Sequence, residues 1–239
     1  MLLFHKRFLL ILFIFLAQII LAQAKEQESQ VYPFEKEINN FKKADSVAMP
    51  PSDAILFIGS SSIRKWKSLE QDMAPLRVIN RGFGGSQTEH AIYYFDQIVL
   101  PYKPHAIVLY EGDNDIASGK TAQEIFEDFK TFALLVKDSL ADTPLFFIAI
   151  KPSIARENML EQMKKANKLI EDYCNTRDHL VFIDVASAMM DNGKIRQDIF
   201  IEDNLHMNDK GYDIWEKIVK AQLVKYLFPL AMQENSIAE

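Results

Sequence analysis

Short apolar runs alternate with stretches of helical spacing along most of the chain. Five runs rich in apolar residues end at turn-forming or polar residues, and each is typical of a buried strand. They cover residues 54–58, 77–80, 105–110, 145–150 and 180–185. Because parallel strands covered on both faces are continuously apolar, this pattern predicts a parallel sheet rather than an exposed antiparallel one.

The segments between these runs carry apolar residues three and four positions apart, which predicts helices with one buried face. The stripes are Phe34, Ile38 and Phe41; Ile125, Phe129, Phe132 and Val136; Met159, Met163, Ala166, Ile170 and Tyr173; and Tyr212, Trp215, Val219 and Tyr226. Thr121 and Glu124 have the spacing of a capping box, and Asn208 can cap the last helix.

Strands alternating with helices predict an α/β fold, a three-layer α/β/α sandwich around a five-stranded parallel sheet. Right-handed crossovers favour the flavodoxin-like strand order. No repeat, low-complexity tract or linker divides residues 25–239, which we interpret as a single domain. In such sheets ligands bind at the carboxyl ends of the strands, so candidate chemistry is expected there.

The first 24 residues have the features of a secretory signal peptide. Lys6 and Arg7 precede an apolar run over residues 8–21, and Ala22-Gln23-Ala24 fits a small-x-small cleavage site. The run is slightly short for a membrane span, so an uncleaved anchor is the weaker alternative. We therefore expect export to the periplasm or the medium after cleavage near Ala24, with no stable membrane anchor.

Composition excludes several classes of protein. The single cysteine, Cys174, excludes a disulfide scaffold and a thiolate zinc site. The formal net charge of −6 argues against nucleic-acid binding through bulk positive charge. His90, His105 and His179 lack partners at ligand spacing, so we interpret them as surface or strand-end residues. No metal or cofactor is expected, and the oligomeric state stays open.

Polar blocks follow the ends of the first three predicted strands, and a fourth lies before the last helix. They are Gly59-Ser60-Ser61-Ser62, Asn80-Arg81-Gly82-Phe83-Gly84-Gly85-Ser86, Glu111-Gly112-Asp113-Asn114-Asp115 and Asp203-Asn204-Leu205-His206. Each alone is more often a turn or a cap. Together they hold a hydroxyl nucleophile, an imidazole base, a carboxylate to orient it, and glycine and asparagine donors for an oxyanion.

These four blocks, in this order, resemble the SGNH (GDSL-type) hydrolases, a family of esterases and acylhydrolases. D-N-L-H-M-N-D-K-G-Y is the most specific block, and N-R-G-F-G-G resembles the platelet-activating-factor-acetylhydrolase-like and carbohydrate-esterase branches. The resemblance implies Ser61 as nucleophile, His206 as base and Asp203 as its partner. It also implies an oxyanion hole made by the N–H groups of Ser61 and Gly85 and the side chain of Asn114.

The family's Gly-Asp-Ser-Leu motif is Gly59-Ser60-Ser61-Ser62 here, so the aspartate before the nucleophile is missing. Ser61 is preferred among the three serines because it lies two residues after Gly59, as in the motif. Ile63 replaces the second glycine of G-x-S-x-G, which argues against the ordinary α/β-hydrolase turn.

The resemblance implies a serine esterase that forms an acyl-enzyme and acts on a small-molecule or glycan ester, with short-chain O-acetyl groups on carbohydrate as first choice. Two alternatives stay open at this point. One is a lysophospholipase or thioesterase with a longer acyl pocket. The other is a non-catalytic module that binds glycan or lipid on the same fold.

Overall fold

The computed structural model describes residues 32–229. Contacts divide the chain at residue 36, and the following description concerns the described residues from Lys36 onward, together with the helix that starts at Glu35. The predicted signal peptide at residues 1–24 lies outside the described residues and stays a prediction.

The centre of this unit is a five-stranded parallel sheet with the order β2-β1-β3-β4-β5. Its strands are β1 (Ile55–Gly59), β2 (Val78–Gly82), β3 (Ala106–Tyr110), β4 (Leu145–Ile148) and β5 (Leu180–Ile183). The predicted fold class and the flavodoxin-like order are therefore confirmed. The strand ends differ slightly, because β2 continues through Arg81 to Gly82 and because β4 and β5 end two residues earlier than their apolar runs.

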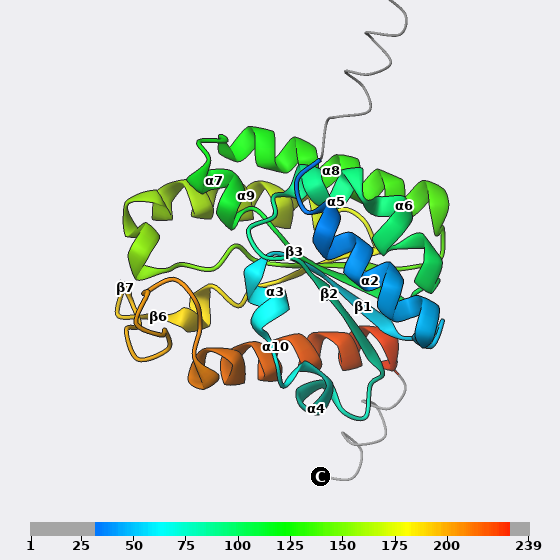
Figure 1. Cartoon of the computed structure of the whole chain (residues 1–239). Coiled ribbons are helices and arrows are strands. Elements are labelled where there is room, and N and C mark those ends of the chain that lie inside the picture. Colours follow the sequence, from blue (N-terminus) through cyan, green and yellow to red (C-terminus); the bar gives the residue numbers. More distant parts are fainter. Residues whose placement is uncertain (1–31, 230–239) are drawn as a thin grey trace, which may run out of the picture. The chain divides into compact units, whose positions relative to one another are not determined.

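Helices cover both faces of the sheet, and Figure 1 shows α8 and α9 on one side and α10 on the other. The α-helices are α2 (Glu35–Val47), α3 (Ser61–Lys65), α4 (Leu69–Met73), α5 (Thr88–Tyr93), α6 (Phe95–Ile98), α7 (Asp113–Ala117), α8 (Ala122–Ser139), α9 (Leu160–Cys174) and α10 (Asp209–Leu227). The described residues also form the 3₁₀ turns η1 (Leu100–Tyr102), η2 (Ile154–Met159) and η3 (Ser187–Met189). A short antiparallel pair consists of β6 (Met190–Asp191) and β7 (Lys194–Ile195).

Two of the long helices begin at the predicted capping residues. The Thr121 hydroxyl accepts from the Glu124 N–H at 3.2 Å, and the Glu124 carboxylate accepts from the Thr121 N–H at 2.8 Å. The Asn208 side chain accepts from the Gly211 N–H at 3.3 Å. Because these bonds satisfy N–H groups that lack helical partners, they fix where α8 and α10 start.

Alternation along each strand divides the core into two halves. Phe147 of β4 faces α8, where it contacts Phe129 with ring centroids 5.0 Å apart. Phe57, Tyr110 and Ile148 belong to the other half, which packs against α10.

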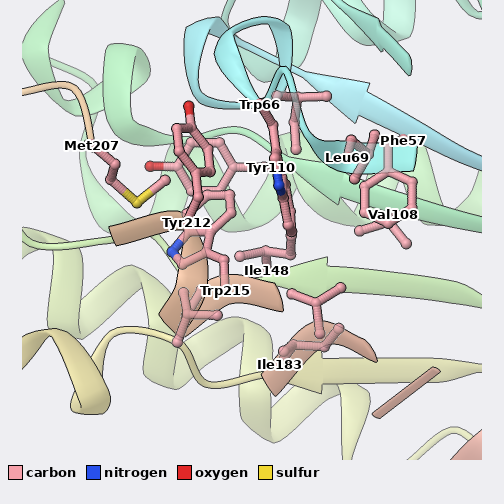
Figure 2. Close-up of a cluster of buried hydrophobic side chains, with 14 of the residues drawn as sticks. Phe57, Trp66, Leu69, Val108, Tyr110, Ile148, Ile183, Met207, Tyr212 and Trp215 are labelled. Carbon is pink, nitrogen blue, oxygen red and sulfur yellow. The ribbon is translucent and has the colours of Figure 1, made fainter. Parts of the chain in front are cut away.

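The half of the core that packs against α10 contains a group of aromatic rings (Figure 2). Trp66, just after α3, stacks on Tyr212 at 5.5 Å and meets Trp215 edge-on at 5.8 Å. Trp215 also packs against Tyr110 at 4.8 Å. Met207 lies beside these rings (Figure 2) and is buried with them. This packing holds the end of α3 and the segment before α10 against the sheet.

One minor expectation about a single residue is wrong, and another holds only in part. His90 is buried rather than on the surface, because it lies in α5, where its Nδ1 accepts from the Gln87 N–H at 2.9 Å. Tyr226, expected on the core face of the last helix, packs edge-on against the buried Phe146 with ring centroids 5.3 Å apart, but it is 38% exposed. Its hydroxyl donates to the Asp178 carbonyl at 2.7 Å.

Candidate active site

The first predicted block forms a tight turn from β1 into α3. Gly59 has φ +151°, and a Cβ there would lie 2.2 Å from the Tyr110 carbonyl oxygen, so only glycine fits. The next N–H, of Ser60, donates to that same carbonyl at 3.2 Å. The Asn80 amide donates to the Ile63 carbonyl at 2.7 Å and the Tyr212 hydroxyl to the Ser62 carbonyl at 2.9 Å. The turn that carries Ser61 is thus held by the strands and by α10.

Ser61, His206 and Asp203 lie in one hydrogen-bonded line. Ser61 Oγ is 2.9 Å from His206 Nε2, and His206 Nδ1 is 2.6 Å from Asp203 Oδ2. The contact joins residues 145 positions apart in the sequence. Ser60 and Ser62 are both buried, at 2% exposure each, so Ser61 is the serine of the three that the structure brings to His206.

The segment from Asp203 to His206 is shaped by the Asp203 carboxylate. Its Oδ1 accepts from the backbone N–H groups of Leu205 at 2.9 Å and His206 at 2.8 Å. Desolvation opposes ionisation of this carboxyl, but the hydrogen bonds from the His206 ring and from the two N–H groups outweigh it and lower its pKa to about 2. Asp203 is therefore a carboxylate at any pH at which an esterase is assayed.

Two of the predicted oxyanion donors, Gly85 and Asn114, lie on loops that are joined by a hydrogen bond. Gly85 has φ +91° and is exposed, in the turn after β2. The next residue, Ser86, offers its carbonyl to Asn114 Nδ2 at 2.9 Å, which ties the loop after β3 to this turn. Within residues 32–229 neither the Ser61 nor the Gly85 N–H has a hydrogen-bond acceptor, and one of the two Asn114 amide hydrogens is left over as well.

Asp113 and Asp115, which flank Asn114, are buried and already have partners. Asp115 accepts from the N–H groups of Thr88 and Gly112, each at 3.1 Å. Asp113 pairs with Arg156 at 2.5 Å and lies 3.5 Å from Lys151. Lys151 is only 1% exposed and donates to the Leu205 carbonyl at 2.8 Å. The position of Lys151 after the fourth predicted strand suggests a contact with substrate. Its burial and its bond to Leu205 argue against such a contact.

Glu111 is a buried group near the site that the sequence pattern did not single out. Its Oε1 is 2.6 Å from Ser86 Oγ, which is 2.8 Å from the Phe83 carbonyl. A hydroxyl has one proton, so it can donate to Phe83 and still bond Glu111 only if Glu111 is the second donor. Burial first, then the Asp115 charge, raises the pKa of Glu111 well above its ordinary value. Both observations indicate a neutral Glu111.

We expect Glu111→Gln to stabilise the protein, and the gain to grow with pH. The folded state holds a proton on Glu111 that the unfolded chain loses above its ordinary pKa of about 4.3, so wild-type stability falls as pH rises. Glutamine keeps a donor toward Ser86 without that proton. The stability difference should widen between pH 5 and pH 8 by at most about 1.4 kcal/mol per pH unit.

Melting temperatures of both proteins across this range check the prediction, with Glu161→Gln as the control because that side chain is 78% exposed. A Glu111→Gln difference that stays flat with pH would show that Glu111 is ionised in the folded protein.

No group of three or more His, Cys, Asp or Glu side chains within residues 32–229 is arranged to hold a metal ion. Among the helices of the same residues, none combines the length and the apolar character that crossing a membrane requires.

Comparison with known proteins identifies the family. Residues 57–214 match the model of the GDSL-like lipase/acylhydrolase family. The alpha1 subunit of platelet-activating factor acetylhydrolase IB from Homo sapiens is 25% identical over 179 residues, covering 71% of this chain and 74% of that protein.

Two solved structures share the fold at lower identity. A GDSL-like lipase from Bacteroides thetaiotaomicron has a TM-score of 0.66 at 20% identity, covering 79% of this chain and 97% of that one. An acetylxylan esterase from Geobacillus stearothermophilus has a TM-score of 0.59 at 14% identity, covering 75% and 95%. With the family model matching well over half of its length, this chain belongs to the GDSL-like lipase/acylhydrolase family and is a carboxylic ester hydrolase.

Proposed function

We propose that this protein is a serine esterase that removes short acyl groups, in the first place O-acetyl groups on carbohydrate, through an acyl-enzyme. The observation that carries the chemistry is the line from Ser61 Oγ through His206 to Asp203, with contacts of 2.9 and 2.6 Å. Its geometry fits a nucleophile, a base and an orienting carboxylate.

The hydrogen bond to Asp203 decides which ring nitrogen of His206 carries the proton. Asp203 is ionised and can only accept, so His206 Nδ1 is the donor. In neutral imidazole the other nitrogen, Nε2, then has a free lone pair, and it faces Ser61 Oγ. Ser61 can therefore donate its proton to His206 as its oxygen attacks.

The reaction runs in two steps. Ser61 Oγ bonds to the ester carbonyl carbon, His206 takes the hydroxyl proton, and the carbonyl oxygen becomes an oxyanion. The carbon–oxygen bond to the alcohol breaks as His206 returns the proton to the departing oxygen, which leaves the acyl group on Ser61. Water, deprotonated by His206, attacks this acyl-enzyme; the second oxyanion then collapses, the bond from the acyl carbon to Ser61 Oγ breaks, and His206 returns the proton to Oγ as the acid leaves.

Hydrogen-bond donors that are already in place before the reaction stabilise both oxyanions. Three of them are the N–H groups of Ser61 and Gly85, which lack an acceptor among the described residues, and the second amide hydrogen of Asn114. A preorganised donor acts more strongly on the developing charge than on the neutral ester, so its benefit appears in kcat.

We expect Asn114→Ala to lower kcat by about 10²–10³ with little change in KM, because it removes one oxyanion donor. Asn114→Asp should do no better, since it replaces the donor with a negative charge. Steady-state kinetics and melting temperature, measured on the same preparation, check this. A destabilised Asn114→Ala protein with wild-type kcat at a permissive temperature would reduce Asn114 to a residue that shapes the turn.

The preference for short acyl groups is supported by the acetyl esters that appear in the names of similar proteins, an acetylhydrolase and an acetylxylan esterase. Initial rates on p-nitrophenyl acetate and p-nitrophenyl octanoate, with acetate release from acetylated xylan, test it. Faster acetate cleavage with acetate release from the glycan supports the proposal. A preference for octanoate favours a lysophospholipase or thioesterase, and no turnover of any ester favours a binding module.

A further inference from the structure

The amide of Asn114 is held from two sides, and the two contacts fix its orientation. Nδ2 donates to the Ser86 carbonyl at 2.9 Å, and Oδ1 accepts from Arg156 Nη2 at 3.0 Å. An arginine can only donate and a backbone carbonyl can only accept. Rotating the amide by half a turn would therefore set donor against donor at Arg156 and acceptor against acceptor at Ser86.

This orientation matters because the two ends of an asparagine amide have nearly the same shape and opposite hydrogen-bonding roles. With the amide held as observed, one Nδ2 hydrogen is used by Ser86 and the other remains for a ligand. With the amide reversed, the carbonyl oxygen of Asn114 would take the place of Nδ2 and would repel an oxyanion.

Arg156 is itself firmly placed. Its Nη1 donates to the Asp113 carbonyl at 2.8 Å and to the Asp113 carboxylate at 2.5 Å. The Arg156 side chain is 15% exposed and that of Asp113 is 7% exposed, so water competes little for this pair. Arg156 lies within η2, but its backbone angles, φ −127° and ψ 28°, are not helical, so the 3₁₀ segment is kinked at this residue.

The same carboxylate connects Arg156 to the segment that carries the base. Asp113 Oδ2 lies 3.5 Å from Lys151 Nζ, which donates to the Leu205 carbonyl, next to His206. The N–H of Ala155 donates to the Asn204 carbonyl at 3.0 Å. Residues 151–156 thus bridge the loop that carries Asn114 and the segment that carries His206.

We propose that Arg156 is a positioning residue for the oxyanion hole: its guanidinium holds the Asn114 amide with a hydrogen toward the reacting carbonyl. The inference rests on the proposed role of Asn114 in catalysis. Arg156 acts through Asn114 and need not touch the substrate. It also draws electron density toward Oδ1, which makes the Nδ2 hydrogens better donors.

We expect Arg156→Met to lower kcat by about 10- to 100-fold with KM nearly unchanged, because a donor that is misplaced, but still present, costs less than a donor removed. Arg156→Lys keeps one charged donor and should recover part of this loss. Arg177→Met is the matched control, since Arg177 bonds the Tyr173 and Thr176 oxygens on α9 and the turn after it. This control should keep wild-type kcat.

The decisive experiment is a double-mutant cycle between Arg156→Met and Asn114→Ala, measured as kcat on p-nitrophenyl acetate. If Arg156 acts through Asn114, the double variant loses no more activity than Asn114→Ala alone. Losses that multiply would overturn the inference, as would wild-type kcat in Arg156→Met. Wild-type kcat in Asn114→Ala would instead refute the proposed oxyanion role. Should Arg156→Met fail to fold, the same cycle is run with Arg156→Lys: a loss in this variant that disappears on the Asn114→Ala background supports the inference, and a loss that multiplies with that of Asn114→Ala overturns it.

Discussion

Replacing Ser61 with alanine is expected to reduce kcat by about 10⁶, the loss seen when the nucleophile of a hydrogen-bonded triad is removed. Ser61 Oγ is the atom 2.9 Å from His206 Nε2, so the substitution leaves the base with no nucleophile to activate. The fold should tolerate it, because Ser61 starts α3 without acting as its cap. Initial rates on p-nitrophenyl acetate, with melting temperature as the folding control, measure the effect.

The neighbouring serines supply the matched controls. Ser60→Ala and Ser62→Ala remove hydroxyls that are buried away from His206 in the same turn. Both variants should keep measurable turnover. A loss in either that equals the loss in Ser61→Ala, in protein that remains folded, would move the nucleophile to a neighbouring position.

Replacing Asp203 with asparagine is expected to reduce kcat by about 10⁴, because the substitution imposes the wrong histidine tautomer. The two backbone N–H groups at Oδ1 require an acceptor, so the amide oxygen of asparagine will face them. Its NH₂ then faces His206 Nδ1, which must accept. The ring proton moves to Nε2, and Nε2 can no longer take the proton of Ser61.

The pH dependence of kcat/KM and the melting temperature of Asp203→Asn check this account. Since Asp203 has a pKa of about 2, the wild-type rate should show no inflection from this group between pH 5 and pH 9. Asp198→Asn is the control. The Asp198 carboxylate lies a few residues before Asp203, pairs with Arg196 and is 49% exposed. A kcat for Asp203→Asn within tenfold of the wild-type value would contradict the assignment.

The layers and strand order could be predicted from the sequence because a parallel sheet covered on both faces leaves a strong apolar signal. β1 and β3 are buried at every residue, and such runs admit few alternatives. The short helices α5 and α6 carry no comparable pattern. The burial of His90 followed from a local cap that pairs Gln87 with the imidazole, an arrangement without a common sequence signature.

The residues of the candidate site could be named in advance because each follows a strand end or precedes the last helix, where a motif with fixed spacing marks it. Their supporting groups could not be named in this way. Arg156 reaches Asn114 from 42 positions away, inside an irregular 3₁₀ segment. Glu111 directly follows the buried strand β3, and the role of this residue becomes clear only from its contact with Ser86.

The most direct test of the proposed chemistry is covalent labelling with a serine-reactive fluorophosphonate, followed by intact-mass measurement and peptide mapping. The phosphonate bonds to an activated hydroxyl and mimics the tetrahedral intermediate, so it reports the nucleophile itself. We predict one adduct per chain, located on Ser61, with none formed in Ser61→Ala. An adduct on Ser60 or Ser62, or no adduct on a preparation that hydrolyses p-nitrophenyl acetate, would contradict the assignment of Ser61 as nucleophile.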